Sequence, residues 1–177
     1  MLRKNTNCRI YHTLNITIGG ITKMKNEKKS EINIKDITIT DDFWSKYIKL
    51  VKNEMIPYQW NVLNDEANIK IDAERDDENI PIEKSHAIEN FKIAAGLKSG
   101  HHYGYVFQDS DVYKWLEAVS YSLINDGNVE LENIADSVID LIGLAQQNDG
   151  YLDTYFTIDA KERKFKRLLE SHELYCA

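Results

Sequence analysis

Apolar residues recur at helical spacing in four stretches of the chain, and polar or turn-forming residues separate them. Recurrence at i, i+3, i+4 and i+7 is typical of amphipathic helices that bury one face. The first stretch predicts a helix capped by Thr40 or Asp41 that ends at Pro57, because proline removes a helical donor and clashes with the preceding turn. Its apolar stripe comprises Trp44, Tyr47, Ile48, Val51 and Met55.

The other three stretches predict further helices downstream. We expect Ser85 to cap a short helix that stops at Gly96, since glycine readily adopts the left-handed conformation after a helix. We expect Asp109 or Ser110 to cap the next helix, which ends at the turn of residues 125–127. The last two apolar stripes are Val112, Trp115, Leu116, Val119 and Leu123, then Leu131, Ile134, Ala135, Val138, Ile142 and Ala145.

The segment before the first helix has a different pattern. Residues 1–35 lack a sustained helical period, and we interpret them as a partly disordered extension with one short strand, in which Met24 is an alternative start to Met1. An alternating β-branched run from Ile32 to Ile39 predicts a strand that leads into the helices. Further along, residues 64–84 are acidic and aperiodic, which indicates a long exposed excursion of the kind that is often functional.

Composition narrows the class of protein. The chain has 177 residues, with 22 Lys and Arg against 29 Asp and Glu, for a formal net charge of -7. We therefore expect no nucleic-acid partner. No apolar run reaches the length of a membrane span and no signal peptide is recognisable, so we expect no membrane partner and a cytoplasmic location. Cys8 and Cys176 are expected to be unpaired thiols.

Consecutive amphipathic helices joined by short turns predict an all-α array of helical hairpins, which is a bundle, a solenoid or a closed toroid. The chain has no clear internal repeat, and this disfavours the solenoid. Its last residues, "ESHELYCA", read as the beginning of another helix with Ser171 as the cap. We therefore expect this chain to be a fragment of a larger protein.

Polar and aromatic residues gather at the ends of the predicted helices. In "HHYGYVFQDSD", Gln108, Asp109 and Asp111 are groups that can bind a polyhydroxylated ligand, although acids in a first helical turn also serve as simple caps. Asp149 belongs to "QQNDGYLDT", which is equally typical of a turn after a helix. His172 lies in "HELYC", which lacks the second histidine of the zinc-protease motif.

Six segments, in this order and at these separations, resemble the N-terminal part of glycoside hydrolase family 127, the β-L-arabinofuranosidases. The resemblance covers about residues 36–177. The segments are "DDFWSKY", "IPYQWNVLND", "SHAIENFKIAAG", "YGYVFQDSDVYKWLEAVSYSL", "AQQNDGYLDTYF" and "SHELY".

This resemblance implies an all-α fold in which residues 36–177 are the incomplete N-terminal part of an (α/α)6-barrel catalytic domain, preceded by a short β-like lead-in. It also implies a retaining mechanism in which a zinc-bound cysteine is the nucleophile and a glutamate is the acid/base. Three cysteines and a glutamate bind the zinc in the family. These residues have no counterpart in the matched region, so we expect no catalytic residue, metal ligand or cofactor in this chain, and Cys176 is not at a zinc-ligand position.

The resemblance does carry over substrate contacts. His172 aligns with a sugar-binding histidine of the family, and Gln108, Asp109, Asp111 and Asp149 lie where the match implies walls of the pocket. The expected ligand is an L-arabinofuranoside-type sugar, bound by the complete enzyme. We expect the chain alone to be inactive and to self-associate through exposed apolar helix faces.

Two alternatives remain open. The chain is then either a small helical carbohydrate-binding or protein-interaction module, or one chain of a split enzyme whose other polypeptide supplies the missing helices and zinc ligands. A monomer that melts cooperatively would favour the module.

Overall fold

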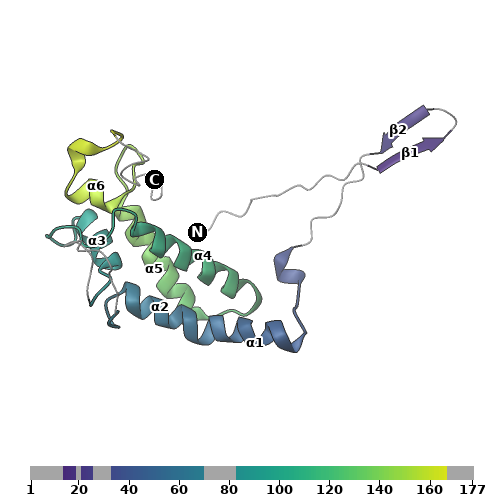
Figure 1. Cartoon of the computed structure of the whole chain (residues 1–177), viewed down its shortest axis with the longest axis horizontal. Helices are drawn as coiled ribbons and strands as arrows, with labels where there is room; N and C mark the ends of the chain where they lie inside the picture. The colour runs from purple at the N-terminus through teal and green to yellow at the C-terminus, as the bar shows by residue number, and fades with distance from the viewer. Residues whose placement is uncertain (1–13, 19–20, 26–32, 70–82, 167–177) are drawn as a thin grey trace, which may run out of the picture. The chain divides into compact units, whose positions relative to one another are not determined.

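The chain divides by its contacts into two compact units, Met1–Ile39 and Thr40–Ala177. Within the parts of the chain that the structure describes, no helix is both long enough and apolar enough to cross a membrane. The computed structural model describes residues 14–18, 21–25, 33–69 and 83–166 (Figure 1).

The first unit contains an antiparallel hairpin of β1 (Leu14–Ile18) and β2 (Ile21–Lys25), with Leu14 opposite Lys25. The extension therefore holds two strands where the sequence predicted one. The strand predicted up to Ile39 is wrong for the residues described there, because Ile34–Asp36 forms a 3-10 helix, η1. The side chain of Asn33 accepts a hydrogen bond from the N–H of Lys35 and so favours a tight turn over an extended run.

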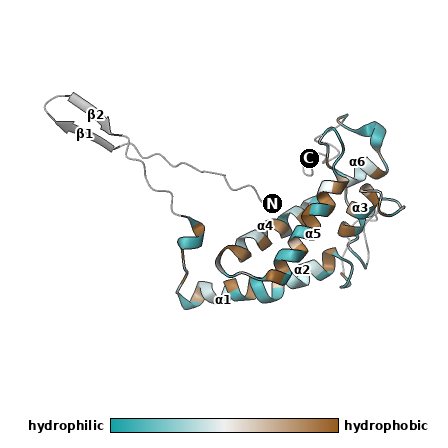
Figure 2. Ribbon diagram, turned by 180° about the vertical axis from the view of Figure 1, so that it is seen from behind, coloured by the Kyte–Doolittle hydropathy of each residue, from teal (hydrophilic) through white to brown (hydrophobic). Residues whose placement is uncertain are grey.

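The second unit begins with α1 (Asp42–Leu50), which confirms the predicted first helix. The carboxylate of Asp41 accepts a hydrogen bond from the N–H of Trp44 at 2.8 Å, so Asp41 is the N-cap. The apolar stripe is present but is not covered within the part of the chain that the structure describes, because α1 has no buried residue. Figure 2 shows hydrophobic turns along α1 as well as along α4 and α5.

The helical path does not end at Pro57, and that prediction was wrong. A π-helical turn, η2 (Val51–Met55), joins α1 to α2 (Ile56–Leu63), and Pro57 is the second residue of α2. In the π turn the N–H of Ile56 donates to the carbonyl of Val51, one residue further back than in an α-helix. We attribute the uninterrupted path to this wider turn, which places proline in a first turn where its missing N–H is tolerated.

The remaining helices follow the predicted pattern at their cores. Gly96 stands after α3 with a φ of +72°, as expected for a glycine stop, and Asn128 caps α5 by accepting from the N–H of Leu131 at 3.1 Å. A short helix at residues 154–158 was not predicted. The elements are α3 (Ala87–Ala94), α4 (Asp109–Asn125), α5 (Val129–Ala145), α6 (Thr154–Ile158) and the 3-10 helix η3 (Lys161–Arg163).

Two predicted caps are wrong. The residue before α3 is His86, in the left-handed region at a φ of 56°, while Ser85 is buried and accepts a hydrogen bond from Gln108. Neither Asp109 nor Ser110 caps α4, since both lie within it, and the carboxylate of Asp109 bonds Thr154 instead. A buried acceptor is satisfied by the donor nearest in space, which local sequence does not reveal.

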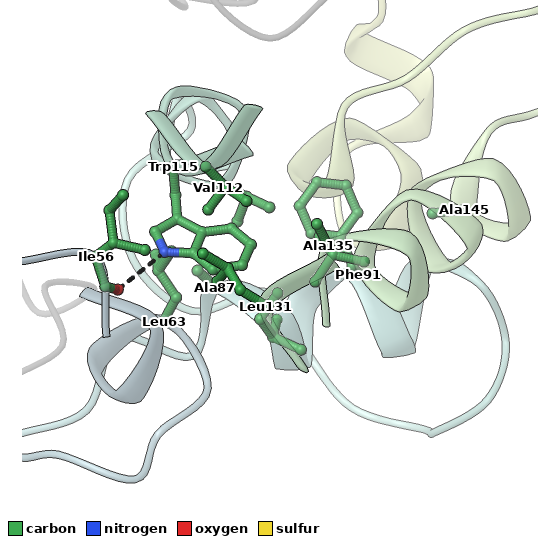
Figure 3. Packing of buried hydrophobic residues seen from close by; sticks show 12 residues of the cluster. Ile56, Leu63, Ala87, Phe91, Val112, Trp115, Leu131, Ala135 and Ala145 are labelled. Carbon is green, nitrogen blue, oxygen red and sulfur yellow. Dashed lines mark hydrogen bonds between the residues drawn. The ribbon is translucent and has the colours of Figure 1, made fainter. Parts of the chain in front are cut away.

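The core lies between α2, α3, α4 and α5, which pack against one another in the pairs α2–α4, α3–α4, α3–α5 and α4–α5. Trp115 of α4 is 2% exposed, and its indole N–H donates to the carbonyl of Ile56 at 3.1 Å (Figure 3). Phe91 of α3 is fully buried in the same cluster. A smaller cluster of Tyr151, Phe156 and Ala160 holds α6.

The ends of the predicted excursion meet each other. The N–H of Ile69 donates to the carbonyl of Glu83 at 2.8 Å. Lys84 also donates from its ammonium to the carbonyl of Asp65 at 2.7 Å. Residues 70–82, which make up most of the excursion, lie outside the described residues.

Candidate functional site

Gln108 stands at the entrance to α4, where its side chain is fixed by hydrogen bonds to neighbouring loops. It is 6% exposed, and its amide nitrogen donates to both the carbonyl and the hydroxyl of Ser85. Its amide oxygen accepts from the N–H of Tyr105 at 3.1 Å. Gly104 makes room for this arrangement, because a Cβ there would lie 1.7 Å from the amide oxygen of Gln108. Gln108 therefore ties the entrance of α4 to the start of α3.

Asp109 joins α4 to α6. It is 1% exposed, and its two carboxylate oxygens accept from the N–H and the hydroxyl of Thr154 at 2.7 and 2.6 Å. Burial raises the pKa of Asp109 to about 6, although the two hydrogen bonds from Thr154 favour the charged form. Asp153 then caps α6 by accepting from the N–H of Phe156. The carboxylate of Asp109 is thus committed to the protein.

Asp111 is the accessible acid of this region. Its side chain is 56% exposed and lies 3.4 Å from the ammonium of Lys114 one turn along α4. Both Gln108 and Asp111 line a hollow of about 460 Å³ between α2 and α4. Tyr58 and Gln59 of α2, Trp115 of α4 and Tyr105 of the loop before α4 are among the side chains that complete its wall. Such a mixture is suited to a sugar, which presents hydroxyls at its edge and C–H groups on its faces.

Asp149 lies elsewhere. Its carboxylate accepts from the N–H of Tyr151 at 3.0 Å and stabilises the predicted turn, in which Gly150 has a φ of +89°. It lines a different hollow of about 480 Å³ together with Ala94 and the end of α5. The structure therefore brings Gln108 and Asp111 into one hollow and keeps Asp149 outside it.

Other predicted residues cannot be placed in this geometry. His172 and Cys176 lie outside the described residues, as does Cys8. Among the residues that are described, no group of three or more His, Cys, Asp and Glu side chains could hold a metal ion. These residues do not fit the zinc site that the family resemblance implies.

A second polar hollow was missed from the sequence. It measures about 540 Å³ and lies at the end of α2 and the start of α3, where Asp65 and His86 face each other. The ring Nδ1 of His86 is 2.9 Å from a carboxylate oxygen of Asp65, and the backbone N–H of His86 donates to the other at 2.7 Å. The sequence marks "SHAIEN" as a polar helix entrance, but a pair separated by 21 residues is not readable from local pattern.

A family comparison supports a common origin for the whole helical unit. The model of the family described as "Beta-L-arabinofuranosidase, GH127 catalytic domain" matches residues 36–177. The non-reducing end β-L-arabinofuranosidase of Bifidobacterium longum subsp. longum is 42% identical over 144 residues, which is 79% of this chain and 22% of that protein.

Solved structures agree with this comparison. A GH127 β-L-arabinofuranosidase from Geobacillus stearothermophilus T6 superposes with a TM-score of 0.67 at 52% identity, covering 78% of this chain and 20% of that one. A second GH127 β-arabinofuranosidase superposes with a TM-score of 0.62 at 28% identity, covering 80% and 21%. The helical unit is part of an (α/α)6-barrel fold. The chain belongs to the GH127 catalytic-domain family, and it spans about a fifth of the length of the relatives it matches.

Proposed function

We propose that this chain is the N-terminal part of a β-L-arabinofuranosidase that hydrolyses terminal β-L-arabinofuranosyl residues with retention. The observation that carries the proposal is the family match over residues 36–177, together with a relative of that activity at 42% identity. Zinc is the proposed cofactor of the complete enzyme, with ligands outside this chain. Residues 1–35 then form an extension, and a cytoplasmic location stays a prediction from the sequence.

Within this proposal the chain supplies walls of the substrate pocket. Asp111 is the proposed direct contact, because its exposed carboxylate can accept hydrogen bonds from sugar hydroxyls in the hollow between α2 and α4. Gln108 and Asp109 are proposed as positioning residues, since hydrogen bonds within the protein already occupy their side chains. His172 and Asp149 remain proposed sugar contacts on the family resemblance.

A segment exchange tests the proposal. Residues 36–177 of this chain replace the matching segment of the Bifidobacterium longum enzyme, and hydrolysis of p-nitrophenyl β-L-arabinofuranoside is measured with zinc supplied. We expect activity from the chimera and none from the 177-residue chain alone. An inactive chimera that is folded and binds zinc, or turnover by the purified chain alone, contradicts the proposal.

The proposed contact at Asp111 has its own test in the chimera. Asp111→Asn is expected to lower kcat/KM about tenfold, the equivalent of one lost hydrogen bond to a charged group. Asp140→Asn is the matched control, because Asp140 is an exposed acid on α5 away from the hollow. Equal kinetics for the two variants would remove Asp111 from the site.

The exposed apolar side chains of α1 fit the split-enzyme alternative as well as the proposed fragment, and both better than a self-contained module. Phe43, Trp44 and Tyr47 are 61%, 58% and 47% exposed and contact one another. A second polypeptide that supplies the remaining helices would cover such a surface. Sedimentation of the pure chain distinguishes the cases: concentration-dependent self-association fits an uncovered face, whereas a monomer that melts cooperatively fits a self-contained binding module.

A further inference from the structure

The hollow at the end of α2 and the start of α3 is built from three separate stretches of chain. Asn64 and Asp65 follow α2, His86 and Glu89 belong to the start of α3, and Tyr103 comes from the loop before α4. Its volume of about 540 Å³ is in the range of small-molecule sites. It is a different hollow from the one that contains Gln108 and Asp111.

The Asp65–His86 pair fixes the protonation pattern of the imidazole ring. Because Nδ1 lies 2.9 Å from the carboxylate of Asp65, the neutral ring carries its hydrogen on Nδ1. Nε2 is then a hydrogen-bond acceptor, and within the described residues the ring has no other hydrogen-bonding partner than Asp65. Both residues have positive φ, 62° for Asp65 and 56° for His86, so two unfavourable backbone positions are held where the pair forms.

The hollow is also lined by an aromatic ring, that of Tyr103, which contacts the ring of His86 and stands on a fixed backbone. Tyr103 is 48% exposed, and its ring lies 4.8 Å from that of His86, tilted by 41°. Asn90, which is fully buried, accepts from the N–H of Tyr103 at 3.0 Å and donates to its carbonyl at 2.8 Å. The position of Tyr103 is therefore set by the protein before any ligand arrives.

The charges around this hollow are matched within the protein. Glu89 is 2.7 Å from the ammonium of Lys98 and 3.9 Å from that of Lys92. Asp65 is bonded to His86 and the formal charges of the two lysines and two acids cancel. A charged ligand would have to compete with these pairs, whereas a neutral ligand with several hydroxyls can bond to Nε2 and to the amide of Asn64 while it packs on Tyr103.

We propose that this hollow binds a neutral sugar, with a ring hydroxyl donating to Nε2 of His86 and the sugar ring packed beside Tyr103. The site is independent of the hollow between α2 and α4 and of hydrolysis, so it goes beyond the proposed function. In a complete enzyme it would hold a sugar unit other than the one that contacts Asp111.

Side-chain and backbone NMR of the 177-residue chain tests the proposal directly. L-arabinose and D-galactose serve as neutral probes, and D-glucuronate as the anionic probe, each added up to about 50 mM because ligands with so few atoms bind weakly. We expect saturable shifts of the His86 ring and the Tyr103 amide with at least one neutral sugar, and weaker or no shifts with D-glucuronate. Absence of saturable shifts with both neutral sugars overturns the proposal, as does a stronger response to D-glucuronate.

Two variants distinguish the loss of the imidazole acceptor from a loss of the fold. His86→Asn keeps a residue that tolerates positive φ and can still donate to Asp65, but removes Nε2. We expect it to weaken sugar binding about tenfold, the equivalent of one lost hydrogen bond. Asp65→Asn is the second variant, since asparagine also tolerates positive φ but no longer fixes the ring with a charge.

His101→Asn is the matched control, because His101 is 85% exposed and bonds Asp159 rather than a group of this hollow. Sugar shifts that persist at full strength in His86→Asn, or that are lost equally in His101→Asn, contradict the role of His86. If His86→Asn does not fold, Asp65→Asn is expected to weaken the sugar shifts, and shifts at full strength in that variant contradict the role of the Asp65–His86 pair. The wild-type comparison of neutral with anionic sugars needs no variant.

Discussion

At the junction of α4 and α6 polar side chains are buried, whereas along α1 large apolar side chains are exposed. Asp109 and Thr154 are 1% and 0% exposed and bond each other twice. On α1, Trp44 and Tyr47 are 58% and 47% exposed. A side chain is buried where the groups that pack against it are present. At the junction Asp109 and Thr154 have each other, whereas no described residue covers the apolar face of α1. Residue type alone is therefore a poor guide to what is core and what is site here.

The largest difference in stability is expected between substitutions of two tryptophans, one buried and one exposed. Trp115→Ala is expected to lower the free energy of unfolding by about 3–5 kcal/mol, because it opens a cavity and removes the hydrogen bond from the indole N–H to the carbonyl of Ile56. Trp44→Ala in the isolated chain is expected to change it by less than about 0.5 kcal/mol, as for an exposed residue. Urea unfolding of both variants measures the difference.

The two tryptophan substitutions are also informative in the chimera that carries residues 36–177. There, the remaining helices of the barrel are expected to cover α1, so the cost of Trp44→Ala should rise to that of a buried aromatic residue, about 3–5 kcal/mol. A cost that stays near zero in the chimera means that α1 is exposed in the complete enzyme as well.

The next largest difference in stability is expected between substitutions of two aspartates of α4. Asp109→Ala leaves the N–H and hydroxyl of Thr154 buried without an acceptor, and is expected to cost about 2–4 kcal/mol. Asp111→Ala removes only an exposed ion pair with Lys114 and is expected to cost less than about 0.5 kcal/mol. If both substitutions lower the free energy of unfolding equally in urea, the hydrogen bonds between Asp109 and Thr154 contribute less to stability than their geometry indicates.

A smaller effect appears in the pH dependence of stability. Burial raises the pKa of Asp109 to about 6, so its contribution to stability falls as pH rises from about 4 to 6. Burial lowers the pKa of His102 to about 4, against the opposing charge of Asp159. The unfolded state therefore binds a proton at His102 more tightly than the folded state does. The contribution of His102 to the free energy of unfolding rises as pH rises from about 4 to 6.5.

Asp109 and His102 change the stability in opposite directions as pH rises, and single substitutions separate the two contributions. Relative to the wild type, Asp109→Asn should become more stable as pH rises from about 4 to 6, and His102→Gln less stable, each by up to about 1.4 kcal/mol per pH unit. The slope for His102 is expected to be smaller because its ring is only partly buried. Difference curves that are flat across this range would contradict both assignments.

The smallest effect concerns the ion pair between Lys52 of η2 and Asp126, just after α4. Asp126 is 72% exposed and Lys52 is 23% exposed, so solvent screens the pair. Asp126→Asn is expected to cost less than about 1 kcal/mol and to matter less at high salt. A larger cost would mean that this contact, rather than the core, positions η2 against the end of α4.

Sequence reasoning succeeded where a local pattern decides the structure. The stripes of α4 and α5, the Asp41 cap and the stop at Gly96 all follow from helical spacing and backbone preference. Pro57 was misjudged because a π turn, which has no clear sequence signal, carries the helical path past it.

The candidate site was harder to predict because its decisive contacts are long-range. Asp109 and Thr154 are 45 residues apart, and Asp65 and His86 are 21 apart. Sequence reasoning selected Gln108, Asp109 and Asp111 as polar groups at one helix entrance. It could not tell that the first two are held by protein partners while Asp111 is accessible. Only tertiary structure assigns a polar residue to a hydrogen-bonded junction or to a pocket.

Amide hydrogen exchange, measured on the isolated chain and on the chimera, shows whether α1 is covered only when the rest of the barrel is present. If this chain is one portion of a larger catalytic barrel, the N–H of Thr154 should be protected in both, because Asp109 already accepts it. The amides of α1 should exchange readily in the isolated chain and become protected in the chimera. Equal, strong protection of α1 in both proteins would show that α1 needs no further part of the barrel, and the chain would then not be one portion of a larger catalytic barrel.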